Sequence, residues 1–273
     1  MLVSYIIDNK KFDFNSPNEQ KFVFEGLEAL SNHKTDLLFD QSWYQDGYSV
    51  FPIFDITKFQ RIFNGISDTV KKYVSEIGVN VTGFKLENYH QFVLNDEDHF
   101  KVVSQTRDLF AEDFDFDIMD LIQYFEDKID VSLTDVFPST GNRLHIIVRI
   151  NRPISNDYNP PHQDLDNDQR DPMVNVWIPI CGVDRDSSLC VVKGSHLIPM
   201  NKIEKSLNGG LLGKNNYSVR MIKSWNGSNE MTRVDVKEGE VLFFTPFLIH
   251  GMAYNQNQNK TRVALEFRLF KKV

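Results

Sequence analysis

The sequence has few cysteines, no excess of basic residues and no long apolar run, and each shortage excludes a class of protein. Cys181 and Cys190 are its only cysteines, too few for a disulfide-stapled secreted fold, so we expect both to be reduced thiols. The formal net charge of -8 excludes a broad basic surface for nucleic acid or anionic lipid.

Signals for a membrane or for export are also missing. No apolar stretch approaches the roughly 20 residues that cross a bilayer, and no secretory pattern opens the chain. We therefore expect a cytoplasmic protein that binds neither nucleic acid nor membrane and that acts on a small-molecule substrate. The sequence indicates no oligomeric state.

The N-terminal half carries helical patterns. Glu19–Leu30 has moderate helical spacing, and we expect it to pack without chemistry of its own. A short strand ending at Pro52 is followed by Asp55 or Thr57 as the N-cap of a helix that runs to about Gly78. The apolar stripe of this helix consists of Phe59, Ile62, Phe63, Ile66, Val70 and Val74.

A second helical region, Arg107–Ile129, is crowded with acidic residues. Calcium binding is one interpretation, but an EF-hand loop needs Gly at its sixth position and Glu at its twelfth. Ile118 and Tyr124 stand at those positions. We therefore interpret the region as a helix with a solvated acidic face.

After Gly141 the spacing of apolar residues changes to the alternation that is typical of strands. Apolar residues alternate with mostly polar ones from Arg143 to Asn151, which gives a strand with one polar face. Further strand-like runs are Val174–Ile180, Ser188–Val192, Val219–Lys223, Val234–Val236, Val241–Thr245 and Thr261–Phe270. Many short strands separated by Gly, Pro and Asn turns favour a sandwich or jelly roll, so the fold class is mainly β with helices (α+β).

No internal repeat, low-complexity tract or linker divides the chain. At 273 residues with 41% hydrophobic content, it can bury a substantial core as one unit. We predict a single domain over residues 1–273, with an N-terminal extension (1–41), a helical support region (42–135) and a β core (140–273).

The stretch Pro160-Pro161-His162-Gln163-Asp164 places an imidazole and a carboxylate two residues apart. On an extended segment residues i and i+2 point the same way, so His162 and Asp164 can reach one ion. A facial site of two His and one carboxylate, which suits non-haem Fe(II), needs a second imidazole from elsewhere. His250, which ends an apolar strand, is the candidate, although a His in such a place is more often a packed core residue.

Arg262 lies on an apolar strand beyond His250. An inward Arg needs an anion, because a buried unpaired charge is costly. Arg268 has the same parity on that strand and is the alternative partner for such an anion; we favour Arg262.

The order of these motifs resembles the phytanoyl-CoA dioxygenase family of Fe(II)- and 2-oxoglutarate-dependent oxygenases. The matching segments are Asp46-Gly47-Tyr48, His162-Gln163-Asp164, Asn175-Val176-Trp177-Ile178-Pro179-Ile180, Val191-Val192-Lys193-Gly194-Ser195-His196, His250-Gly251 and Arg262. The resemblance runs from about residue 42 to the C-terminus. The motifs point specifically to iron and to the co-substrate, but they do not identify the substrate.

The resemblance implies a double-stranded β-helix, a cupin-like jelly roll open at one end with N-terminal helices packed along it. It implies that His162, Asp164 and His250 are the catalytic iron ligands and that Arg262 holds a carboxylate of 2-oxoglutarate. The implied cofactors are Fe(II), 2-oxoglutarate and O2, with 2-oxoglutarate converted to succinate and CO2 as a small molecule is hydroxylated. Asp164 favours hydroxylation, because related halogenases lack this carboxylate.

Three further positions are less specific. Trp177 resembles a family position near the co-substrate, with a core aromatic as the alternative. Arg149, on a polar strand face, is a candidate for cofactor or substrate binding, with an ordinary surface ion pair as the alternative. Ala264 departs from many relatives, which carry Ser or Thr two places after the Arg, and His196 is expected to hold a turn.

A different functional class stays open, because a jelly roll also serves binding proteins. The alternative is a non-catalytic cupin-like metal- or sugar-binding module, or a degenerate oxygenase. Arg262 separates the two readings, since a binding module needs no buried Arg opposite an iron site. We expect loops 166–171 and 205–216 to shape the substrate pocket.

Overall fold

The computed structural model describes residues 2–15, 20–24, 36–53, 55–114, 116, 118–143, 145–164, 171–212, 215–216 and 218–272. The helices are α1 (Ile56–Glu76), α2 (Tyr89–Phe92), α3 (Asp96–Gln105) and α4 (Ile118–Ile129). The strands are β1 (Leu2–Ile7), β2 (Lys10–Asn15), β3 (Phe22–Phe24), β4 (Tyr48–Pro52), β5 (Leu133–Thr134), β6 (Ile147–Asn151), β7 (Met173–Cys181), β8 (Cys190–Val191), β9 (Ile203–Ser206), β10 (Leu211–Leu212), β11 (Asn215–Asn216), β12 (Ile222–Trp225), β13 (Glu230–Arg233), β14 (Glu240–Phe244), β15 (His250–Gly251) and β16 (Arg262–Lys271). Short 3-10 turns lie at Tyr44–Asp46, Leu86–Asn88, Ala111–Asp113, Ser195–Leu197 and Met200–Lys202.

The largest sheet has the strand order β4-β14-β7-β16-β5, and β6 pairs with the first half of β16. Alternation along β16 sends Val263, Leu265 and Phe267 into the core that the sheet shares with the helices. The opposite parity carries Arg262, Glu266 and Arg268, which therefore face the interior between the sheets.

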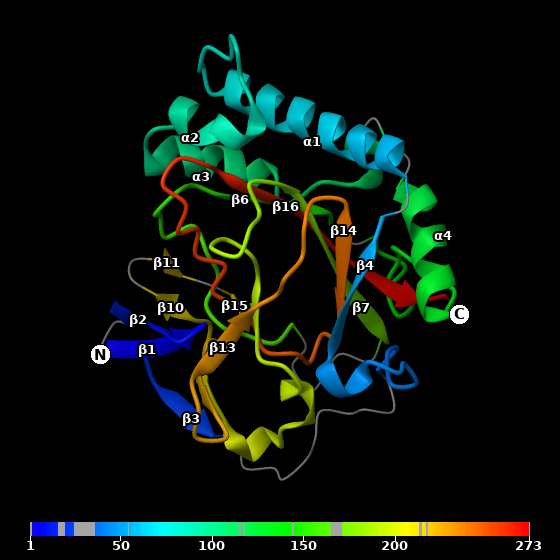
Figure 1. Ribbon diagram of the computed structural model, residues 1–273, viewed down its shortest axis with the longest axis vertical. Coiled ribbons are helices and arrows are strands. Elements are labelled where there is room, and N and C mark those ends of the chain that lie inside the picture. Colours follow the sequence, from blue (N-terminus) through cyan, green and yellow to red (C-terminus); the bar gives the residue numbers. More distant parts are fainter. Residues whose placement is uncertain are drawn as a thin grey trace.

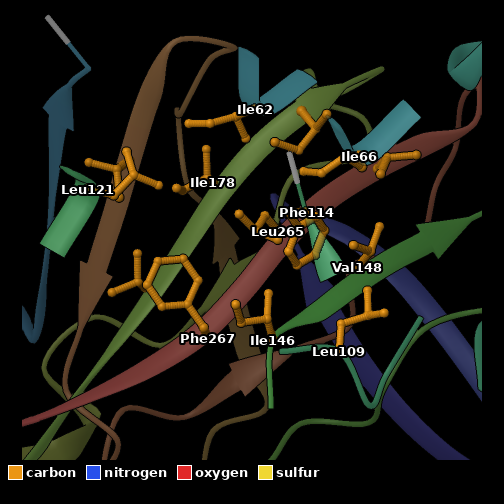
Figure 2. Close-up of a cluster of buried hydrophobic side chains, with 14 of the residues drawn as sticks. Ile62, Ile66, Leu109, Phe114, Leu121, Ile146, Val148, Ile178, Leu265 and Phe267 are labelled. Atoms are coloured by element: carbon orange, nitrogen blue, oxygen red, sulfur yellow. The ribbon is translucent and has the colours of Figure 1, made fainter. Parts of the chain in front are cut away.

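The helices cover the outer face of this sheet (Figure 1). Helix α1 begins where predicted, because the Asp55 carboxylate accepts hydrogen bonds from the backbone N–H groups of Thr57 and Lys58. Figure 2 shows the resulting core, in which Ile62 and Ile66 of α1 lie over Ile178 and Leu265 of the sheet. This packing makes the large sheet a rigid support for the side chains on its other face.

The opposite wall is made of two smaller sheets, ordered β15-β8-β13-β1-β2 and β12-β9-β3. The N-terminal strand β1 pairs in parallel with β13, more than 220 positions away. Tyr5 of β1 is fully buried and donates its hydroxyl to the Ile222 carbonyl, 2.8 Å away. The N-terminal extension is therefore part of this wall.

The mainly β, jelly-roll class with helices in the N-terminal half is confirmed, and none of the described helices is long and apolar enough to cross a membrane. Three local predictions were wrong. Phe22–Phe24 is a strand rather than a helix because it pairs with β9, while residues 19 and 25–30 lie outside the described part. Val234 and Val236 follow β13 as buried packing residues. Within Arg107–Ile129, the α-helix begins only at Ile118.

Candidate metal centre and cavity

Two distant segments bring the predicted ligands together. His162 and His250 face each other across a pair of backbone hydrogen bonds, from each N–H to the other's carbonyl, with lengths of 2.9 and 3.0 Å. Their imidazole centroids are 4.3 Å apart. Gly251 is required beside them, because its φ is +139° and a Cβ there would lie 2.5 Å from the Pro160 carbonyl oxygen.

Each imidazole is oriented by a backbone carbonyl. The Nδ1 atom of His162 lies 2.7 Å from the Pro160 oxygen, and that of His250 lies 3.0 Å from the Leu248 oxygen. A carbonyl only accepts, so Nδ1 carries the proton in both rings and each Nε2 keeps its lone pair. Both Nε2 atoms lie 3.6 Å from a carboxylate oxygen of Asp164, and the ligand atoms of the three residues all lie within 4.8 Å of one another.

Asp164 is held from behind by two residues paired across β7 and β16. Arg268 donates from Nη2 to Oδ1 at 2.8 Å, and Asn175 donates from Nδ2 to Oδ2 at 2.7 Å. Burial by itself would raise the pKa of Asp164, but the neighbouring Arg268 guanidinium holds it well below the usual range. Asp164 is therefore a carboxylate at neutral pH, with both oxygens fixed in place.

Burial also decides the charge of the second imidazole. It lowers the pKa of His250 to about 4, and the neighbouring His162 contributes in the same direction. His250 is therefore neutral at pH 7, which is the form that binds a metal. Two imidazoles beside one carboxylate match a facial non-haem iron site and leave further coordination positions open.

The triad borders a cavity of about 1160 Å³. We call its deep side the inner wall; the charged and aromatic side chains there are Arg149, Trp177, Arg262 and Glu266. They lie on β6, β7 and β16, which are neighbours in the large sheet. The inner wall therefore contains all three predicted cofactor-binding residues.

Arg262 is 2% exposed, and among the described residues it contacts no carboxylate. Its Nη2 donates to the Ala253 carbonyl at 3.3 Å, and its Nε has no hydrogen-bond partner. The guanidinium carbon lies 5.6 Å from the centre of the Trp177 ring. Burial, reinforced by the positive charge of Arg149, lowers the pKa of Arg262 to about 9. The site thus holds a desolvated cation with unused donor capacity.

Arg149 is placed differently from Arg262, because its guanidinium forms a two-point ion pair with Glu266. The Nε–Oε2 and Nη2–Oε1 distances are 2.9 and 3.2 Å. Burial would raise the pKa of Glu266, but Arg149 lowers it to about 2. Ala264 lies directly across from Arg149 in the strand pairing, on the face between Arg262 and Glu266.

Glu266 and Asn175 were missed by the sequence reasoning. Glu266 shares the parity of Arg262 and Arg268 on an otherwise apolar strand, and that pattern was a usable signal. Asn175 lies within a strand that is buried throughout, where an amide also needs a partner. The loop predictions are only partly covered: residues 165–170 lie outside the described part, and residues 205–210 are not among those that line the cavity.

The motif Gly194-Ser195-His196 supports the site indirectly. The hydroxyl of Ser195 accepts a hydrogen bond of 2.8 Å from the N–H of Ile249, directly before His250. His196 is buried in the turn Ser195–Leu197, and a Cβ on Gly47, whose φ is +79°, would lie 2.7 Å from its Nδ1. The N–H of Gly194 also donates to the Asp46 carbonyl. The motifs Asp46-Gly47-Tyr48 and Gly194-Ser195-His196 therefore contact each other, and Ser195 holds the strand of His250 in place.

The model of the family "Phytanoyl-CoA dioxygenase (PhyH)" matches residues 44–264. This is most of the chain, and the protein belongs to the phytanoyl-CoA dioxygenase family. A search of curated proteins finds no match.

Solved structures share the architecture at low sequence identity. AviO1 from Streptomyces viridochromogenes Tue57 is 16% identical, with 90% of this chain and 97% of that chain covered and a TM-score of 0.50. The non-heme monooxygenase ThoJ is 15% identical, with coverages of 86% and 77% and a TM-score of 0.47. The epimerase SnoN, solved with Fe3+, alpha ketoglutarate and nogalamycin RO, is 13% identical, with coverages of 84% and 80% and a TM-score of 0.44. The similarity to AviO1 supports the fold alone.

Proposed function

We propose that this protein is an Fe(II)- and 2-oxoglutarate-dependent dioxygenase that hydroxylates a small molecule, and that it works as a single domain. The overall reaction consumes substrate, 2-oxoglutarate and O2 and yields hydroxylated substrate, succinate and CO2. Membership of a dioxygenase family is the background to this proposal. Its specific support is the pairing of the His162, Asp164 and His250 triad with Arg262 in one cavity.

The unpartnered Arg262 is the observation that carries the proposal. Burying a guanidinium without an acid costs several kcal/mol unless an anion completes the site. A carboxylate is the anion that a planar guanidinium binds with two parallel hydrogen bonds. Arg262 and the metal ligands border the same cavity, so a dicarboxylate that reaches from one to the other satisfies both.

The donor set fits Fe(II). His162 and His250 supply Nε2 lone pairs, and Asp164 supplies a carboxylate whose other contacts, to Arg268 and Asn175, come from the protein side. When bound, Fe(II) supplies the oxygen activation that no amino-acid side chain can perform. The presence of Asp164 supports hydroxylation, because the halogenases that resemble this family lack the carboxylate.

The remaining residues position and shield the reactants. Arg262 orients 2-oxoglutarate through its far carboxylate, while Trp177 covers the guanidinium and keeps water from its face. Arg149 forms an ion pair with Glu266, so the two charges cancel and the wall beside the co-substrate is polar without a net charge.

The direct test is Fe(II)- and O2-dependent formation of succinate from 2-oxoglutarate, followed with wild type and His162→Ala. We expect turnover in wild type only, and a matched exposed histidine, His145→Ala, should retain it. If wild type binds neither Fe(II) nor 2-oxoglutarate, the proposal is wrong. Binding of metal by the wild type without binding of 2-oxoglutarate would instead favour a cupin-like metal-binding module.

A further inference from the structure

The cavity changes character between its deep and outer parts. Trp177 and Arg262 of the inner wall are almost fully buried, at 1% and 2% exposure. Three apolar side chains that line the same cavity are largely exposed, namely Leu94 at 79%, Phe100 at 70% and Ile154 at 49%. We call these three residues the apolar rim. They come from two segments: Leu94 lies just before α3 and Phe100 within it, and Ile154 lies in the turn after β6.

Large exposed apolar side chains that gather around one opening mark a binding surface rather than chance exposure. The chain has other exposed apolar residues, such as Ile56 and Phe24, but those do not line the cavity. The rim therefore offers apolar contact to whatever passes it on the way to the metal ligands.

Ile154 adds an independent observation, because its backbone is strained. Its φ is +49°, a region that β-branched residues avoid and that costs about 1–3 kcal/mol. The strained turn is held by hydrogen bonds from the Ile154 N–H to the Asn255 carbonyl and from the Ser155 hydroxyl to the Arg152 carbonyl, both 2.9 Å. Glycine or asparagine would relieve the strain, so the fold alone does not explain an isoleucine.

The two sides of the rim are tied together by charge. Arg152 donates to Asp157 from its backbone N–H and Nε at 2.9 Å and from Nη2 at 3.1 Å. Its Nη2 also reaches Asp96, at the start of α3, at 2.6 Å. Leu94 and Phe100 flank Asp96, so this ion pair connects the segment of α3 to the turn that carries Ile154.

Among the described residues that line the cavity, Arg262 is the one arginine that has no acidic or other charged partner. Arg149 is paired with Glu266, Arg152 is paired with Asp157, and Arg107 also has interaction partners. His99 is neutral at pH 7, because burial lowers its pKa to about 4, and burial lowers the pKa of His90 too. A substrate that carries phosphates or carboxylates would find no free cation there.

We propose that the apolar rim of Leu94, Phe100 and Ile154 selects the substrate, and that this substrate is an uncharged, largely apolar small molecule rather than an acyl-CoA. This inference rests on the proposed function, which reserves Arg262 for 2-oxoglutarate. The apolar body of the substrate lies against the rim and the adjacent walls, while its reacting carbon reaches past Ile154 toward the triad.

The test compares three probes with one alkyl chain length: n-octanol, octanoate and octanoyl-CoA. Binding to the full chain is measured by calorimetry in the presence of 2-oxoglutarate and Mn(II), without turnover. We expect n-octanol to bind most tightly. Leu94→Ser, Phe100→Ser and Ile154→Ser should each weaken it roughly tenfold, the effect of losing most of one apolar contact. The exposed controls Ile56→Ser and Phe24→Ser should leave it unchanged.

Tighter binding of octanoyl-CoA, or equal losses in the controls, would overturn the proposal. A second variant separates binding from folding: Ile154→Gly should raise the thermal midpoint by relieving the strained φ, while it weakens n-octanol binding. A lower midpoint with unchanged binding would make Ile154 a structural residue only. Repeating the probe titrations without metal or 2-oxoglutarate tests binding at the rim separately from the enzymatic activity, so it remains informative if the protein forms no succinate.

Discussion

Two arginines on the same face of β16, Arg262 and Arg268, differ in their surroundings: Arg262 is buried, and Arg268 is partly exposed and paired with a carboxylate. Arg268 donates to Asp164 at 2.8 Å and lies 4.0 Å from Glu266. Arg262, at the other end of the strand, donates to a backbone carbonyl and, among the described residues, to no carboxylate, whereas the Nε atoms of both arginines lack a hydrogen-bond partner. This difference supports the separate roles that we propose, in which Arg268 holds Asp164 and Arg262 binds 2-oxoglutarate. The sequence had left either arginine open as the clamp, and this contrast supports Arg262.

The largest expected effect is on stability. Arg268→Met removes the charged partner of buried Asp164 and should lower the free energy of unfolding by about 3–5 kcal/mol. Arg262→Met removes a charge that has no acid partner, so it should cost much less. Urea unfolding of both variants, with and without Mn(II), checks this. Bound Mn(II) should reduce the loss of unfolding free energy in Arg268→Met, because the metal ion replaces the missing positive charge beside Asp164. Equal losses in the two variants would erase the distinction.

The next effect concerns co-substrate binding. Arg262→Ala should weaken 2-oxoglutarate binding by about 1–3 kcal/mol, the range for hydrogen bonds to a charged group. Arg262→Lys should recover part of this, since it keeps the charge but loses the two-point geometry. Calorimetric titration of 2-oxoglutarate into the Mn(II)-loaded variants measures both. If 2-oxoglutarate binding is unchanged in Arg262→Ala, the clamp is Arg149 or Arg268.

The cavity offers a third comparison, because His99 is a buried and paired side chain that lines it and can still take up a proton. Burial depresses the pKa of His99 from 6.5 to about 4, against the opposing pull of Asp157 3.3 Å away. The unfolded chain therefore binds a proton at a higher pH than the folded one. This makes folding progressively less favourable as pH falls through 6.5 toward 4. Between pH 7 and pH 5 the loss should be about 2 kcal/mol.

His99→Gln isolates this contribution, because other groups such as His250 titrate equally in both proteins. Urea unfolding at pH 7 and pH 5 should show a smaller difference in the variant than in wild type. The same pH dependence in both would place the titrating group elsewhere.

The smallest effect tests the departure at Ala264, which lies between Arg262 and Glu266 on the inner face of β16. Ala264→Ser adds one hydroxyl on the same face as the clamp. We expect 2-oxoglutarate binding to tighten by about 1 kcal/mol, the value of one neutral hydrogen bond. Weaker binding would mean that the fully buried site has no room for the extra atom.

Local patterns predicted much of the scaffold. Asp55 and the apolar stripe of α1 predicted that helix because capping and helical periodicity act within a few residues. The i, i+2 spacing of His162 and Asp164 predicted a shared ligand face for the same reason. Predictions failed where a distant partner decides, as at Phe22–Phe24, which becomes a strand only because β9 lies beside it.

By itself, the sequence determined the candidate ligands, the strand that carries Arg262 and the parity that groups it with Arg268. Only the tertiary structure decided which arginine is neutralised. That choice depends on Asp164, 104 positions from Arg268 along the chain, and on the pairing of Asn175 with Arg268 across β7 and β16. The apolar rim could not be predicted either, since the exposure of its side chains and the positive φ of Ile154 are properties of the folded chain. The alternation of side chains along a strand determines which face each one occupies, but its contacts depend on distant residues that only the folded chain brings close.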